Sequence, residues 1–176
     1  MFPEDGKYID NQADFSASSL SFGGETIAEC GCGVVAAYNV LISRGLRISF
    51  YQVYKYSCHI HSTSGGLNRD EIISIITHFD PTISLSGSTP FAVLVFHYMY
   101  DSSKKDGDIY LGGHVQAGNY IEGEKFYMHN ATNKDSYSFL ANISSYCSYL
   151  ETYCGYYIEG GSKHYYHSYV KADKLY

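Results

Sequence analysis

Two stretches of the chain combine apolar spacing with the end signals of helices. The first starts at Cys32, continues through small and apolar residues and is stopped by Gly45, so we expect a buried helix over roughly Cys32–Arg44. The second starts at Asn68, where Glu71 three residues later completes a capping-box pattern, and it stops at Asp80-Pro81. Its apolar face would consist of Ile72, Ile73, Ile75, Ile76 and Phe79.

A third apolar run follows Thr89-Pro90. A threonine before a proline is typical of a helix cap followed by a proline in the first turn, so residues 91–100 are predicted to form a third, almost fully buried helix.

The pattern changes after Asp106-Gly107. Residues 114–120 and 125–129 alternate in polarity on either side of Glu122-Gly123-Glu124, which predicts a β-hairpin with a glycine turn. His114 and Asn130 would then lie side by side at the open end of that hairpin.

The remaining segments give weaker signals. Residues 1–29 are predicted to be an irregular lead-in that wraps the body, residues 137–153 another helix ending at Gly155, and residues 156–170 strands around Gly160-Gly161. With no internal repeat and no low-complexity linker, the chain is expected to be one α+β domain over residues 1–176. Its helices would come first and an antiparallel sheet after them.

Composition narrows the possible partners. A chain of 176 residues is the size of one ordinary domain, and its net charge of −6 argues against a nucleic-acid partner. No run approaches the ~18 apolar residues of a membrane span, and the first residues lack the pattern of a signal peptide. We therefore expect a soluble chain, either mature as it stands or excised from a larger protein. Its compartment and oligomeric state stay open, and an odd count of five cysteines leaves their redox state open too.

The aromatic balance is unusual, with 20 tyrosines and no tryptophan. Tyrosine rings can pack while their hydroxyl groups stay in water, so a partly wet core is the simpler interpretation. The alternative is a recognition surface in the tyrosine-rich segment Tyr146–Tyr169.

Three residues have the order of a thiol nucleophile, its base and the group that orients the base. Cys32 opens the first predicted helix, where free N–H groups and the helix dipole favour a thiolate. His114 follows two glycines, and Asn130 lies sixteen residues after His114. Each has an ordinary alternative when taken alone: Cys32 as a small core residue, His114 as a strand histidine bonded to a carbonyl, and Asn130 as a turn residue.

Together, the helix-opening Cys-Gly, the later Gly-His and the following Asn resemble the papain-like cysteine peptidase superfamily. The closest motifs are those of bacterial double-glycine-type leader peptidases and their uncharacterised relatives. The likeness covers Cys32 to Asn130, with Val34 where the bacterial relatives often have proline. It implies a papain-like α+β fold in which the nucleophile helix packs on an antiparallel sheet. It also implies Cys32 as nucleophile, His114 as general base and acid, and Asn130 as orienter.

The resemblance further implies an oxyanion-hole glutamine shortly before the nucleophile. Gln12 is the only upstream candidate, twenty residues before Cys32, and a looped lead-in would have to bring it to the site. Cys30 is a rival nucleophile, although the family register favours Cys32.

No metal or organic cofactor is expected. Cys58-His59-Ile60-His61, Cys30-x-Cys32 and His164-x-x-His167 lack the paired spacing of zinc sites, and His59 and His61 are interpreted as histidines of an exposed strand or loop.

The sequence thus predicts a papain-like thiol hydrolase that cleaves peptide amides of a peptide or protein substrate through an acyl-enzyme. Two alternatives remain open. One is an inactive binding module with a tyrosine-rich partner surface. The other is an acyltransferase or deamidase effector domain, toxin-like, that uses the same triad.

Overall fold

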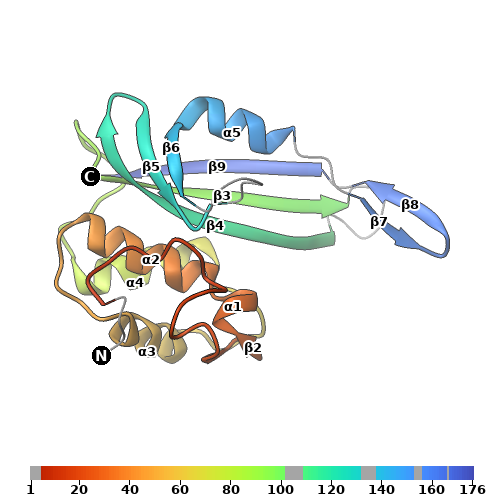
Figure 1. Ribbon diagram of the computed structural model, residues 1–176, viewed down its shortest axis with the longest axis horizontal. Helices are drawn as coiled ribbons and strands as arrows, with labels where there is room; N and C mark the ends of the chain where they lie inside the picture. The colour runs from red at the N-terminus through yellow and green to blue at the C-terminus, as the bar shows by residue number, and fades with distance from the viewer. Residues whose placement is uncertain (1–4, 102–108, 132–137, 153–155, 166) are drawn as a thin grey trace.

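The computed structural model describes residues 5–101, 109–131, 138–152, 156–165 and 167–176. A five-stranded antiparallel sheet separates two helical layers, with α1 to α4 on one face and α5 on the other (Figure 1). The predicted combination of helices with an antiparallel sheet is confirmed.

Most helices come in the first half of the chain and most strands in the second half. They are β1 (Ser21–Phe22), β2 (Glu25–Thr26), α1 (Ile27–Cys30), α2 (Cys32–Ser43), α3 (Phe50–Ile60), α4 (Arg69–Phe79), β3 (Ala92–Asp101), β4 (Ile109–Glu122), β5 (Lys125–His129), β6 (Phe139–Asn142), α5 (Ile143–Glu151), β7 (Tyr156–Glu159), β8 (Ser162–Tyr165) and β9 (His167–Leu175).

The sheet has the strand order β6-β5-β4-β3-β9, with all neighbours antiparallel. The predicted hairpin is present as β4 and β5, paired from Glu122 with Lys125 to Ala117 with His129. Strand β4 continues beyond the end of β5 toward Ile109, so His114 lies on a stretch of β4 that β5 does not cover. Helix α2 packs against β4.

The prediction of a helix over residues 91–100 was wrong, because this run forms the strand β3. Ala92, Leu94 and Phe96 enter the core beneath α2 to α4, whereas Val93 and Val95 enter a second core beneath α5. A strand with cores on both faces is apolar at every position, and periodicity then cannot distinguish it from a buried helix.

The helices expected from Cys32 and from Asn68 are present as α2 and α4. The Asn68 side chain caps α4 by accepting a hydrogen bond from the Glu71 backbone N–H at 2.9 Å. Helix α3 was not predicted, and it contains His59, which we expected in a strand or loop. His61 does lie in the loop after α3 as its C-cap, but the expectation that it is exposed was wrong, because its side chain is buried.

The lead-in wraps the body, as expected. The Ile9 backbone N–H donates to the Asn39 side chain in α2 at 2.9 Å, and the Asn39 amide donates back to the Ile9 carbonyl at 2.9 Å. The Asp10 carboxylate contacts Nδ1 of His129 in β5 at 2.6 Å. The lead-in therefore joins α2 to the sheet.

The tyrosine-rich segment divides into a packed part and a projecting part. Tyr146 is buried where α5 packs on the sheet, whereas the β7–β8 hairpin extends beyond the end of the sheet (Figure 1). The predicted helix over residues 137–153 is shorter, because residues 139–142 pair with β5 as strand β6. Tyr137, Tyr153 and Tyr166 lie outside the described residues.

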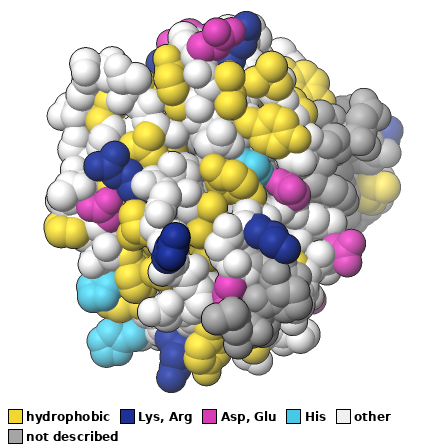
Figure 2. Space-filling model, turned by 60° about the vertical axis from the view of Figure 1, so that its left-hand side comes forward, with side chains coloured by type: hydrophobic (Ala, Val, Ile, Leu, Met, Phe, Trp, Pro, Cys, Tyr) yellow, Lys and Arg dark blue, Asp and Glu magenta, His cyan; other side chains and the backbone are white. Residues whose placement is uncertain are grey.

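On the face shown in Figure 2, basic and acidic side chains are scattered among apolar ones, and neither sign of charge dominates. Within the described part of the chain, no helix has the length and apolar character that crossing a bilayer requires.

Candidate active site

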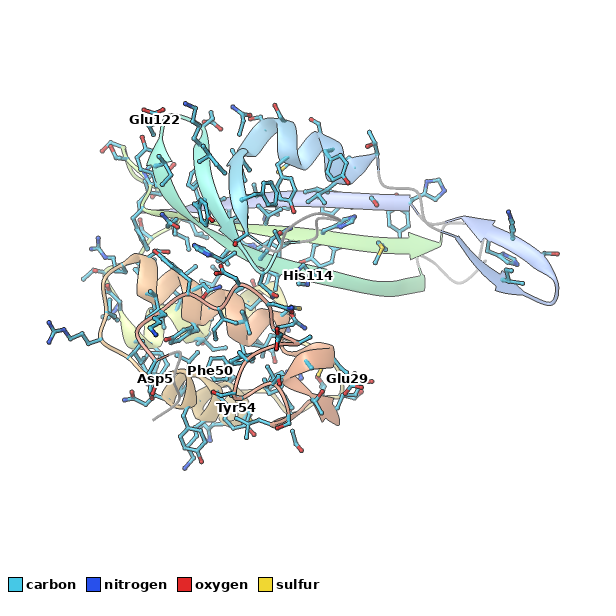
Figure 3. All side chains as sticks on the ribbon, viewed as in Figure 1. Asp5, Glu29, Phe50, Tyr54, His114 and Glu122 are labelled. Atoms are coloured by element: carbon cyan, nitrogen blue, oxygen red, sulfur yellow. The ribbon has the colours of Figure 1, made fainter. Side chains whose placement is uncertain are left out.

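Cys32, His114 and Asn130 meet where the helical layer faces the sheet. Cys32 is the first residue of α2, His114 lies in β4, and Asn130 directly follows β5. Figure 3 shows His114 on the side of the sheet that faces the helices. The structure thus brings together three residues that are far apart in sequence.

Two glycines allow the close packing around Cys32. A Cβ atom at Gly33 would lie 2.8 Å from Cβ of Leu67, and one at Gly31 would lie 2.6 Å from the Ile27 carbonyl oxygen. Both distances are shorter than real contacts, so the backbone on each side of Cys32 approaches its neighbours in a way that only glycine allows. The start of α2 is thereby fixed against α1 and the chain before α4.

The surroundings of the Cys32 thiol favour its ionised form. Burial alone would raise its pKa, but a hydrogen bond to His114, the charge of His114 and the backbone N–H groups of Val115 and Gly33 together lower the pKa below its ordinary value. The Gly33 N–H belongs to the first turn of α2, where such groups lack helical partners. The thiol therefore has the features of an activated nucleophile.

The His114 ring shows the complementary shift. Burial would lower its pKa, but the hydrogen bond with Cys32, the thiolate charge and the carbonyl of Asn130 raise the pKa above its ordinary value. A lowered thiol pKa and a raised imidazole pKa both favour a thiolate–imidazolium pair. Such a pair can attack a carbonyl carbon and then protonate a leaving group.

Asn130 reaches His114 through its backbone. The Nε2 atom of His114 donates to the carbonyl oxygen of Asn130 at 2.5 Å, while the side chain of Asn130 faces Gln12. Asn130 has a φ of 53°, in the left-handed region that asparagine tolerates better than most residues. We expected the side chain to orient the imidazole, whereas in the structure the peptide group does so.

Gln12 comes close to the site but is bound in a different way from the one expected. Its Nε2 donates to the carbonyl of Ala28 at 3.0 Å and that of Ile27 at 3.4 Å, and its Oε1 accepts from Nδ2 of Asn130 at 2.8 Å. Its backbone N–H donates to Oδ1 of Asn130 at 2.9 Å. In this arrangement Gln12 clamps Asn130 to α1, and its amide protons point to carbonyl groups of the fold instead of an oxyanion.

Cys30 has the opposite character to Cys32. Its thiol is buried and donates to the Phe22 carbonyl at 2.9 Å. Burial, followed by the charge of Glu25, raises its pKa above the ordinary value. These shifts favour Cys32 over Cys30 as the nucleophile.

A groove of about 350 Å³ runs past the thiol. It is lined by residues of α1, α2, the loop before α4, β3 and β4: Glu29, Cys30, Cys32, Gly65, Gly66, Leu67, Phe96, Tyr98, Gly113, His114 and Val115. The sequence did not indicate some of these residues as part of a site. Phe96 and Tyr98 belong to the run predicted as a helix, and Gly65-Gly66 belongs to a stretch for which no element is predicted. The described residues of the tyrosine-rich segment do not appear in this lining, although Tyr169 stacks on Tyr98 with ring centroids 6.2 Å apart.

The described residues contain no cluster of three or more side chains suited to hold a metal ion. Comparison with known proteins adds no relative: no family model, curated protein or solved structure matches the chain.

Proposed function

We propose that this protein is a thiol hydrolase of papain-like type that cleaves peptide amide bonds through Cys32, His114 and Asn130. The observation that carries the proposal is the meeting of Cys32 at the start of α2 with His114 in β4, whose Nε2 donates to the Asn130 carbonyl, beside a groove. The lowered pKa of the Cys32 thiol and the raised pKa of the His114 ring support it. Perturbed groups of complementary chemistry in a cleft are typical of catalytic sites.

The reaction would run in two halves. The Cys32 thiolate attacks the carbonyl carbon, and the resulting oxyanion is stabilised by backbone N–H groups at the start of α2. The C–N bond then breaks as His114 gives its proton to the leaving amine, which leaves a thioester on Cys32. In the second half, water attacks the thioester while His114 takes up a proton, and the C–S bond breaks to release the acid and regenerate the thiolate.

Asn130 and Gln12 would support this cycle without touching the substrate. The Asn130 carbonyl accepts from Nε2–H of His114, and this leaves the other ring nitrogen to exchange a proton with the thiol. Gln12 holds Asn130 through two hydrogen bonds. The nucleophile, the base and the orienter are all groups of the protein, so the proposed reaction needs no added cofactor.

The lining of the groove suits a peptide substrate. It exposes backbone at Gly65, Gly66 and Gly113 next to the aromatic rings of Phe96 and Tyr98. Backbone polar groups suit a main chain, and aromatic rings suit an apolar side chain. The amide nitrogen of the substrate would leave first in both a hydrolase and an acyltransferase. The two differ in the group that then accepts the acyl group from the thioester.

The test is digestion of a mixed peptide library with mass spectrometry of the new termini, using the wild-type chain, Cys32→Ser and the matched variant Cys30→Ser. We expect the wild type and Cys30→Ser to cleave peptides and Cys32→Ser to be inactive. Cleavage by Cys32→Ser at the wild-type rate would refute the proposal.

Added glycinamide distinguishes the acyltransferase alternative, because it competes with water for the thioester. Hydrolysed products should dominate. Products that carry glycinamide in preference to water would instead identify a transferase.

A further inference from the structure

One wall of the groove is a pair of glycines in the loop between α3 and α4. Gly65 has a φ of 88°, and its backbone N–H donates to the Gly23 carbonyl at 2.8 Å. A Cβ atom at Gly23 would lie 2.0 Å from the Gly65 carbonyl oxygen, and one at Gly66 would lie 3.0 Å from the Cys30 carbonyl oxygen. The loop is thus pressed against the chain just before the nucleophile.

His61 holds this loop from behind. Its Nε2 lies 3.0 Å from the Gly65 carbonyl oxygen, and its Nδ1 lies 3.0 Å from Oε1 of Glu71 in α4. The His61 side chain is only 2% exposed, and Phe22 stacks on the ring with centroids 5.1 Å apart. The ring therefore joins the end of α3, the start of α4 and the groove wall.

Both partners of the His61 ring are hydrogen-bond acceptors. A carbonyl oxygen and a carboxylate oxygen can each accept a hydrogen bond from a ring N–H. The ring is thus held between two acceptors, one in the groove wall and one in α4.

Among the contacts that the structure describes, Glu71 carries the only charge beside the His61 ring. Helix α4 contributes the Glu71 carboxylate, β1 contributes the apolar ring of Phe22, and the loop contributes the Gly65 carbonyl. The second carboxylate oxygen of Glu71 accepts from the Asn68 backbone N–H at 2.8 Å, which fixes the carboxylate in place.

We propose that His61 is a positioning residue for the substrate groove: anchored on Glu71, it holds the Gly65 carbonyl and so keeps the Gly65–Gly66 wall in place beside Cys32. The inference rests on the proposed function. It assigns to His61 a part in peptide binding and none in the activation of the thiol.

The first experiment compares two reagents that attack Cys32. Iodoacetamide is small and tests the thiolate alone, whereas benzyloxycarbonyl-Phe-Ala fluoromethyl ketone must also lie along the groove. In His61→Gln we expect the peptidyl reagent to react slower by on the order of tenfold, because the ring's hydrogen bond to the groove wall is lost, with little change for iodoacetamide. The matched control is His59→Gln, an exposed histidine of the same helix, which should react like the wild type with both reagents.

Equal rates for His61→Gln and wild type with the peptidyl reagent would overturn the proposal. An equal fall with both reagents would also overturn it, because His61 would then act on the thiol or on the whole fold.

The second experiment follows hydrogen exchange of the Gly65 backbone N–H by NMR in the full chain and needs no activity. This N–H donates to the Gly23 carbonyl, so it should exchange faster in His61→Gln and in Glu71→Gln than in the wild type if the ring holds the wall. Unchanged exchange would contradict the positioning role, and Glu71→Gln provides this test even where His61→Gln fails to fold. If wild-type Cys32 reacts no faster with either reagent than the exposed Cys58, the proposed function fails while the NMR result still decides the role of His61.

Discussion

The peptide carbonyl of Asn130, and not its side-chain amide, accepts the hydrogen bond from Nε2 of His114. The side chain of Asn130 is occupied by Gln12, which binds it through both its backbone and its amide. The orientation of the imidazole therefore depends on the backbone conformation at Asn130, which has a φ of 53°.

Substitutions at Asn130 should separate backbone from side-chain effects. Asn130→Gly keeps the left-handed backbone and the carbonyl but loses the Gln12 contacts, whereas Asn130→Ala also adds backbone strain of roughly 1 kcal/mol. We expect turnover to fall in the order wild type, Gly, Ala, with partial activity in both variants. Steady-state kinetics on a cleaved peptide would measure it, and equal, complete inactivity of both would show that the amide itself orients His114.

Gln12 and Asn130 should behave as one coupled unit. Gln12→Ala removes the partner of Asn130, so a double-mutant cycle should give a coupling energy of about 1 kcal/mol or more in unfolding free energy. Chemical denaturation of the single and double variants measures this. Additive effects would mean that the two side chains act independently, and a loss of turnover in Gln12→Ala with no loss of stability would return Gln12 to the oxyanion role.

The pH dependence of thiol reactivity should report the Cys32–His114 pair. The lowered thiol pKa makes thiolate present at a pH below that of an ordinary cysteine, and the raised His114 pKa keeps the imidazolium to a higher pH than usual. The ion pair thus exists between the two values, and peptide cleavage should follow a bell-shaped profile across that window.

In His114→Gln the thiol loses its ion-pair partner while burial persists, so its pKa should rise and the alkylation profile should move to higher pH. Iodoacetamide rates across a pH series would show the change. Superimposable profiles for His114→Gln and the wild type would contradict the pair.

The two parts of the tyrosine-rich segment should differ in their effect on stability. Leu150 in α5 is 1% exposed, so Leu150→Ala should cost about 2–4 kcal/mol of unfolding free energy. The neighbouring Tyr149 is 50% exposed, and Tyr149→Ala should change the unfolding free energy by less than about 0.5 kcal/mol.

Deletion from Gly155 onward should unfold the protein, because it removes the edge strand β9, which pairs with β3 along most of its length. Replacing residues 156–165 alone with a flexible linker should leave the melting temperature close to that of the wild type. A large fall in melting temperature on that replacement would show that the hairpin contributes to the core.

Local signals predicted the elements that hold the reacting groups. Gly45 marked the end of α2 closely, the Asn68–Glu71 pair marked the start of α4, and the glycine turn at Gly123 gave the hairpin that brings Asn130 beside His114. These signals depend on residues that are close together in the chain, and a sequence displays such residues directly.

What the sequence could not predict depends on tertiary contacts. The apolar run of β3 looked helical because the second core under α5 was not foreseeable from the run itself. The role of His61 depends on Glu71 and Gly65 meeting on either side of its ring, and the conformation of Asn130 depends on Gln12. None of these contacts leaves a periodic signal.

The bond between Gln12 and Asn130 spans 118 residues of chain. Contacts of such long range close a large loop, and the entropy cost of that closure has to be met before the contact can form. During synthesis α2 would emerge well before residue 130, so a nascent chain would contain Cys32 without its oriented partner. For the hydrolase proposed above, a newly made chain would then have no activity until nearly the whole domain had folded.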